Sequence, residues 1–200
     1  MILRHSHTSP FVRKVMVVLH ETGLIDRVEL KTVDGWAEPE DLAAENPLSM
    51  VPTLVLDNGS VLFDSPVICE YLDRLGQGEI MLPGGDARWE VLREQALGDG
   101  ILDAAVSLFV ETNKRPEAIR WDWWIDLKRR AIDRSLDQLE SQVARYGERV
   151  DLGTITIAVA LSYLDLRGAV GDWRPNRPQL AAWHGEFADR PSMVRTQPPA

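Results

Sequence analysis

A segment rich in glycine and proline, residues 76–85, divides this 200-residue chain into two halves with different hydrophobic patterns. Strand and helix signals alternate before the segment, whereas strand signals are missing after it. Glycine and proline at this density are typical of linkers between domains. We therefore predict two domains: an α/β domain over residues 1–78 and an all-α domain over residues 86–200.

The first half predicts the element order βαβαββα. Its clearest signal is Asn58-Gly59, which lies between two short apolar runs and is typical of a β-hairpin turn. Pro10 and Pro66 indicate helix starts, because each follows a serine that can cap a helix. The expected strands are residues 2–3, 28–33, 52–56 and 60–63, and the expected helices are residues 10–23, 39–45 and 65–75.

The second half predicts a helical bundle with one buried central helix. Residues 152–166 are apolar on nearly every face, which is typical of a helix surrounded by others. Asp151 precedes this helix, and Thr154 three residues later is a weak capping-box partner. We expect further helices over residues 86–111, 116–146 and 178–188, with Pro116 in the first turn of its helix, and an irregular tail.

The composition indicates a globular protein, because a hydrophobic content of 44% is enough to form a core. The net charge is −9 and the chain has no basic stripe, so we expect no nucleic-acid partner. No apolar run approaches the ~18 residues that span a membrane, and no secretory signal is visible at the start. The single cysteine, Cys69, excludes an internal disulfide framework, so a reducing, cytoplasmic location is the default expectation.

The first candidate site is residues 5–14, between the first strand and the first helix, where open α/β sheets bind ligands. It holds the hydroxyl groups of Ser6, Thr8 and Ser9 and two histidines. An alternative interpretation is that Ser9 is purely structural, since serine before proline is a preferred helix cap. The histidines have no carboxylate at metal-ligand spacing, so we predict no metal, and a lone histidine is more often structural than catalytic.

The second candidate site consists of two motifs that resemble a known family. Residues 46–54 read N-P-x-x-x-V-P-x-L, and residues 64–72 read D-S-x-x-I-x-x-Y-L. Together with the turn at residues 8–14, they resemble the glutathione transferase superfamily, and the pattern looks most like its bacterial YibF-like members. The resemblance extends over the whole chain. It implies a thioredoxin-like N-terminal domain that binds glutathione and an all-helical C-terminal domain that binds the second substrate.

Several residues receive a role only from this resemblance. It implies a cis peptide bond before Pro52, which would leave the backbone of Val51 as an open strand edge for the cysteinyl part of glutathione. The Asp64 carboxylate can accept from the ammonium of the γ-glutamyl end, and Ser65 can bind its carboxylate at a helix N-terminus. The glutathione-binding residues that the resemblance implies are Ser9, Phe11, Met50, Val51, Pro52, Asp64 and Ser65.

Ser9 takes the place that a reactive cysteine has in thioredoxin and glutaredoxin relatives. A serine cannot form a mixed disulfide, which disfavours a glutathione-dependent reductase or peroxidase. Its hydroxyl can instead donate to the thiolate of glutathione, and one such bond, worth ~1.5–3 kcal/mol, lowers a thiol pKa of ~8.5 by roughly one to two units. Ser9 is therefore the expected catalytic residue, and Thr8 is its close rival.

The second substrate is expected to be a small hydrophobic electrophile held by Phe11, Gly100 and Ile101. Gly98 and Gly100 lie inside a predicted helix, where glycine costs ~1 kcal/mol, so another backbone or a ligand is expected close by. A tryptophan cluster follows in the next helix, and the simpler interpretation is that two of its members pack that helix into the bundle. The cluster is Trp121, Trp123 and Trp124.

Two alternatives to a transferase stay open. The chain could be a non-catalytic glutathione-transferase-like module that binds a protein partner, although intact Val51-Pro52 and Asp64-Ser65 motifs favour retained glutathione binding. It could also be a reductase or peroxidase, which Ser9 disfavours. The family resemblance further implies a two-fold homodimer.

Overall fold

The computed structural model describes residues 1–34, 36–37, 39–76 and 81–199. Contacts divide the chain into one unit of Met1–Gly85 with Pro191–Ala200, and a second unit of Asp86–Arg190. The predicted linker falls at this division, although its residues 77–80 lie outside the described part. The end of the chain differs from the prediction, because it packs with the first unit instead of the second.

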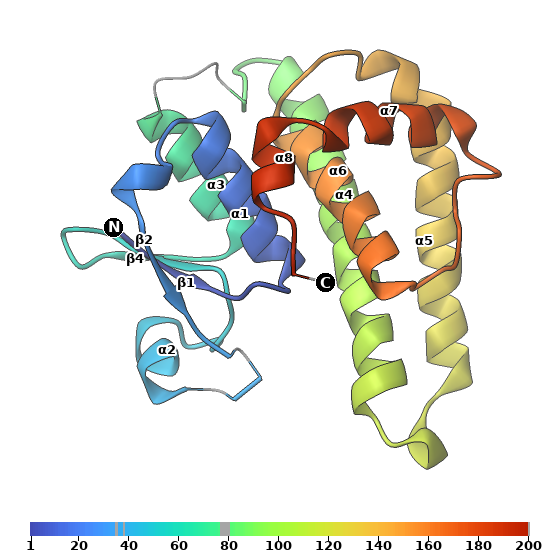
Figure 1. The fold of residues 1–200 in the computed structure, drawn as a ribbon, viewed down its shortest axis with the longest axis horizontal. Coiled ribbons are helices and arrows are strands. Elements are labelled where there is room, and N and C mark those ends of the chain that lie inside the picture. The colour runs from blue at the N-terminus through green and yellow to red at the C-terminus, as the bar shows by residue number, and fades with distance from the viewer. Residues whose placement is uncertain (35, 38, 77–80, 200) are drawn as a thin grey trace. The chain divides into compact units, whose positions relative to one another are not determined.

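The first unit is built on a four-stranded mixed sheet in the order β2-β1-β3-β4. The central strand β1 runs parallel to β2 and antiparallel to β3, which in turn pairs with β4. Figure 1 shows α1 and α3 on one side of the sheet and α2 on the other. The strands are β1 (Ile2–His5), β2 (Glu29–Thr32), β3 (Thr53–Val55) and β4 (Val61–Leu62), and the helices are α1 (Pro10–Glu21), α2 (Glu40–Glu45) and α3 (Ser65–Leu75).

Local sequence explains where these elements begin and end. Ser9 caps α1 and Pro10 fills its first position, while Gly23, with φ of 69°, turns the chain away after the helix. Gly59, with φ of 83°, forms the predicted hairpin turn between β3 and β4. The described part confirms the predicted order βαβαββα, to which it adds a short 3-10 turn at Ile25–Arg27.

The second unit is a helical bundle around α6 (Leu152–Arg167), whose residues 152–161 are all buried. The predicted cap is present as a full capping box, in which Thr154 N–H donates to Asp151 at 2.9 Å and the Thr154 hydroxyl accepts from Asp151 N–H at 3.0 Å. The other α-helices are α4 (Ala87–Phe109), α5 (Asp122–Gln142) and α7 (Pro178–Ala188), with shorter turns at Val110–Lys114, Glu117–Ile119 and Val143–Arg145.

The helix predicted to begin at Pro116 begins instead at Asp122. Pro116 has ψ of 135° and Trp121 has ψ of 96°, so the backbone at both residues is extended rather than helical. The carboxylate of Glu111 accepts from the Trp121 N–H at 2.8 Å, which fixes the chain just ahead of α5. A long-range side-chain contact therefore sets this helix start, and a proline preference alone could not predict it.

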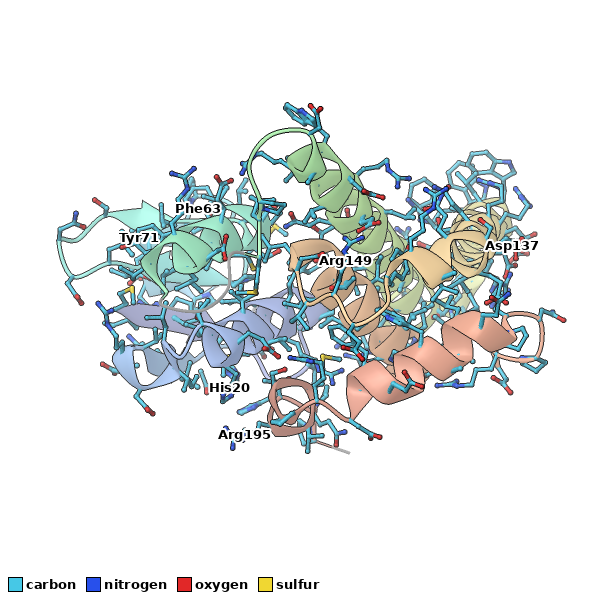
Figure 2. The ribbon with its side chains drawn as sticks, turned by 90° about the horizontal axis from the view of Figure 1, so that it is seen from above. His20, Phe63, Tyr71, Asp137, Arg149 and Arg195 are labelled. Atoms are coloured by element: carbon cyan, nitrogen blue, oxygen red, sulfur yellow. The ribbon has the colours of Figure 1, made fainter. Side chains whose placement is uncertain are left out.

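The tail predicted to be irregular contains a further helix, α8 (Pro191–Arg195), which packs on α1. The Arg13 guanidinium donates to Met193 O at 3.2 Å, and the Ser192 hydroxyl donates to Glu21 at 2.5 Å. Figure 2 shows His20 of α1 near Arg195 of α8, and burial, together with the Arg195 charge, holds the pKa of His20 below its ordinary value. Within the described residues, no helix is both long and apolar enough to cross a membrane.

Candidate functional site

The sheet register brings both predicted motifs to one end of the first unit. Arg4, next to the end of β1, pairs with Thr53 at the start of β3, and Leu62 at the end of β4 pairs with Leu54, so β1 and β4 end where β3 begins. Neighbouring strands lie about 4.8 Å apart. Residues 51–52, just ahead of β3, therefore lie between the exit of β1 toward Ser9 and the exit of β4 toward Asp64.

Ser9 is half-buried at the N-terminus of α1. Its Oγ accepts a long hydrogen bond of 3.4 Å from Val12 N–H, so it does cap the helix as the simpler interpretation expects. In the part of the chain that is described, no acceptor takes the Ser9 hydroxyl proton. That proton is available to a ligand. Thr8 is exposed one residue earlier, outside the helix.

Val51 lies in a loop that a buried asparagine holds in place. Asn46 is 1% exposed, and its amide donates to Met50 O at 3.1 Å and to the Thr53 hydroxyl at 2.9 Å. That hydroxyl also donates to Met50 O, at 2.8 Å, and the expected cis peptide bond before Pro52 is present. Among the described residues, none hydrogen-bonds to the backbone of Val51, which leaves this edge open for pairing.

Asp64 and Ser65 form the start of α3. Asp64 occupies the cap position but its side chain makes no capping hydrogen bond, and no described cation pairs with its carboxylate. The residue is exposed, so the carboxylate faces solvent. Ser65, by contrast, is 1% exposed at the first helical position. The peptide bond between Phe63 and Asp64 is also cis.

Comparisons with known proteins agree with these motifs. Residues 8–75 match the family described as "Glutathione S-transferase, N-terminal domain", and residues 123–186 match "Glutathione S-transferase, C-terminal domain". The Escherichia coli K12 protein described as "Uncharacterized GST-like protein YibF" is 36% identical over 198 residues, which is 97% of this chain and 96% of that protein.

The chain belongs to the glutathione S-transferase family. Two solved structures of a Pseudomonas fluorescens Pf-5 glutathione transferase family member are each 44% identical to it. One holds glutathione and has a TM-score of 0.96, covering 100% of this chain and 99% of that one. The other holds S-(propanoic acid)-glutathione and has a TM-score of 0.92, covering 100% of both chains. The predicted fold, a thioredoxin-like domain followed by an all-helical domain, is confirmed.

Two buried basic side chains lie near the first turn of α1 in this transferase-family protein. His5 is 8% exposed, its Nδ1 has no partner among the described residues, and its ring lies 4.6 Å from that of His7, centroid to centroid. Burial lowers the pKa of His5, and the nearby His7 lowers it further. Burial also lowers the pKa of Arg13 to about 10. His5 is therefore neutral near pH 7.

The three residues predicted to hold the second substrate do not share one unit. Phe11 is half-buried in the first unit, whereas Gly100 and Ile101 belong to α4 in the second. Ile101 is 1% exposed, so its side chain serves the core, and a Cβ at Gly100 would meet nothing within 4 Å. Gly98 makes the close backbone approach instead, because a Cβ there would lie 3.0 Å from the carbonyl carbon of Thr156 and 3.1 Å from Ile157 N.

The tryptophan cluster also differs from its simpler interpretation. Trp121 is 58% exposed and Trp123 is 53% exposed, so these two do not pack α5 into the bundle. Their rings stack on each other with centroids 4.8 Å apart, and Trp124 stacks on Trp121 at 6.4 Å. A pocket of about 440 Å³ in the second unit is lined by Val106, Val110, Glu111, Trp121 and Trp124 among others.

The sequence alone predicts no role for Asn46 and Thr53, although both belong to the motif at residues 46–54. Their hydrogen bonds to Met50 O orient the loop that presents Val51, so they position the site without needing to touch a ligand. The signal was the Asn-Pro pair itself, because an asparagine side chain commonly bonds the backbone of a following turn. Here its Oδ1 also accepts from Leu48 N–H at 3.0 Å. Within the described residues, no group of three potential metal-ligating side chains occurs.

Proposed function

We propose that this protein is a glutathione transferase that binds glutathione along Met50–Pro52 and activates its thiol with Ser9. The observation that carries the proposal is the convergence of three unsatisfied groups at one end of the sheet. These are the hydroxyl proton of Ser9, the backbone of Val51 and the carboxylate of Asp64. They match the thiol, the cysteinyl backbone and the γ-glutamyl ammonium of an extended tripeptide. The relative crystallised with glutathione adds support.

In the proposed mechanism the Ser9 hydroxyl donates to the sulfur of bound glutathione. The N-terminus of α1 adds a favourable field for negative charge at the same place. A charge-assisted hydrogen bond of ~1.5–3 kcal/mol corresponds to a thiol pKa lowered by roughly one to two units, so the thiolate is well populated near pH 7. The thiolate attacks the electrophilic carbon, a carbon–sulfur bond forms, and the leaving group departs with its electron pair. The enzyme forms no covalent bond.

The second substrate is proposed to be a small electrophile that contacts Phe11 as it reaches the sulfur. The relative that was crystallised with S-(propanoic acid)-glutathione suggests that a carboxylate on this substrate is tolerated. Gly100 and Ile101 become weaker candidates for this contact, since Ile101 is almost fully buried. We further propose a homodimer, in line with the family, which light scattering of the purified protein tests directly.

A conjugation assay with a panel of electrophiles tests the proposal, with Ser9→Ala and Thr8→Ala as a matched pair. We expect Ser9→Ala to lower kcat at least about tenfold with a nearly unchanged KM for glutathione, whereas Thr8→Ala stays within about threefold of wild type. Equal turnover in Ser9→Ala would remove this hydroxyl from the mechanism. A protein that flows through immobilised glutathione and conjugates nothing would instead support the alternative of a non-catalytic, partner-binding module.

A further inference from the structure

A small polar pocket in the second unit is assigned to neither substrate. It has a volume of about 140 Å³ and lies between the end of α4, the first half of α5 and the C-terminus of α6. One water occupies ~30 Å³ of the liquid, so a molecule of a few heavy atoms fits. Two arginines from different helices, Arg129 and Arg167, share its lining with Phe109, Thr112, Asn113 and Ala169.

The two arginines lack a counter-charge. Within the described ranges, neither Arg129 nor Arg167 forms an ion pair, and no carboxylate lines the pocket. Two other arginines of the same unit are neutralised, since Arg149 pairs with two carboxylates and Arg177 also pairs with two. The two unpaired guanidinium groups make this small pocket locally positive, although the net charge of the chain is −9.

Arg167 is held in a fixed orientation. Its Nε donates to the Tyr163 hydroxyl at 3.3 Å, and its guanidinium carbon lies 4.1 Å from the centroid of the Phe109 ring. Of the guanidinium nitrogens only Nε donates in these contacts, and among the described residues the two terminal nitrogens have no hydrogen-bond partner. A planar fork of this kind is suited to binding the two oxygens of a carboxylate or phosphate.

A simpler interpretation accounts for only one of the two side chains. Arg167 ends α6, and a cation there is favoured by the partial negative charge of a helix C-terminus. The last turn is already closed, however, because Gly168 N–H and Ala169 N–H return to the carbonyls of Asp165 and Leu164. The helix C-terminus also does not explain why Arg129, an exposed residue of α5, lines the same pocket.

We propose that this pocket binds a small oxyanion, a carboxylate or a phosphate, between Arg129 and the fixed fork of Arg167. The site lies wholly within the second unit, so it goes beyond the proposed thiol chemistry of Ser9 and does not depend on it. Thr112 and Asn113 shape the wall rather than bind, since the Asn113 amide donates to Phe109 O and to the Thr112 hydroxyl.

The test is an NMR titration of the full-length, glutathione-free protein at constant ionic strength, in one arm with sodium propanoate and in the other with sodium phosphate. We expect saturable shifts of the amides of residues 112–113 and 167–169 in at least one arm, and the arm that saturates identifies the source of the oxyanion. Arg129→Gln should weaken that binding about tenfold. Arg130→Gln is the matched control, because Arg130 is exposed on the same helix and does not line the pocket.

Arg129 is exposed, so its replacement leaves the fold intact, and Arg167→Gln with an unchanged melting temperature should show the same loss. The proposal is overturned if neither anion saturates, or if Arg130→Gln weakens binding as much as Arg129→Gln does. The second result would mean that the anion responds to overall charge rather than to this pocket.

Discussion

Ser9 has one observed role and one proposed role, and the two use different parts of one hydroxyl group. Its oxygen accepts from Val12 N–H and so caps α1, while its proton remains free for a ligand. Alanine at this position therefore removes both a helix cap, worth ~1 kcal/mol of stability, and the proposed thiolate donor. A loss of activity in Ser9→Ala is informative only beside a melting curve, which separates the two roles. Asp64 presents no such ambiguity, since its carboxylate makes no cap.

The lowered pKa of His5 predicts how the stability of the protein depends on pH. Burial lowers its pKa below the ordinary value of 6.5, so the unfolded chain binds this proton more readily than the folded protein does. The contribution to the free energy of unfolding is therefore intact above pH ~6.5 and is lost as the pH falls below it. We expect His5→Gln to flatten that part of the stability curve, measured by urea unfolding from pH 7.5 to 5.

His7→Gln is the control for the His5 variant. It leaves His5 buried and removes only the smaller cause of the lowered pKa, so the fall in stability should persist in reduced form. A wild-type free energy of unfolding that rises as the pH drops through this window would contradict the assignment. So would a His5→Gln profile identical to that of wild type.

The loop between α2 and β3 is the element that presents the proposed glutathione edge. Asn46→Ala removes its three side-chain hydrogen bonds, to Met50 O, the Thr53 hydroxyl and Leu48 N–H. We expect the free energy of unfolding to fall by ~1–3 kcal/mol and glutathione to bind at least about fivefold more weakly, as measured by calorimetry. Asn58→Ala is the matched control, because Asn58 is exposed in the hairpin turn. Equal glutathione affinity in both variants would mean that Asn46 does not position the site.

Two glycines of α4 give a matched pair of variants that test how this helix packs on α6. A Cβ at Gly98 would lie 2.8 Å from Thr156 Cγ2 and 3.0 Å from its carbonyl carbon, so Gly98→Ala should destabilise the protein by ~1–3 kcal/mol. A Cβ at Gly100 meets open space, so Gly100→Ala should gain up to ~1 kcal/mol from helix propensity. Thermal unfolding measures both, and a stabilising Gly98→Ala would contradict the close approach.

At the scale of the whole molecule, the features that depend on neighbouring sequence were predictable and those that depend on distant contacts were not. The hairpin at Asn58-Gly59 and the cap at Asp151 follow from local preferences. The start of α5 depends on Glu111, ten residues before Trp121. The helix α8 depends on Arg13, 180 residues before Met193. The role of Asn46 lies between these cases, because its three bonds stay within seven residues of it and the Asn-Pro pair indicates only the one to Leu48 N–H.

The overall charge of the molecule also bears on how glutathione could bind. A net charge of −9 gives no general attraction for an anionic tripeptide, so the proposed binding of glutathione depends on local donors such as the Val51 backbone and the start of α3. We propose that one of these donors, the Ser9 hydroxyl, stabilises a bound thiolate. Because this role concerns the ionisation of the thiol, it can be tested without knowing the electrophile.

A pH titration of protein-bound glutathione, followed by the ultraviolet absorbance of its thiolate, tests this role directly when the wild type is compared with Ser9→Ala. We predict that the bound thiol in the wild type has a pKa roughly one to two units below that in Ser9→Ala. Titration of both proteins at the same pH, close to the ~8.5 of a free thiol, would contradict it.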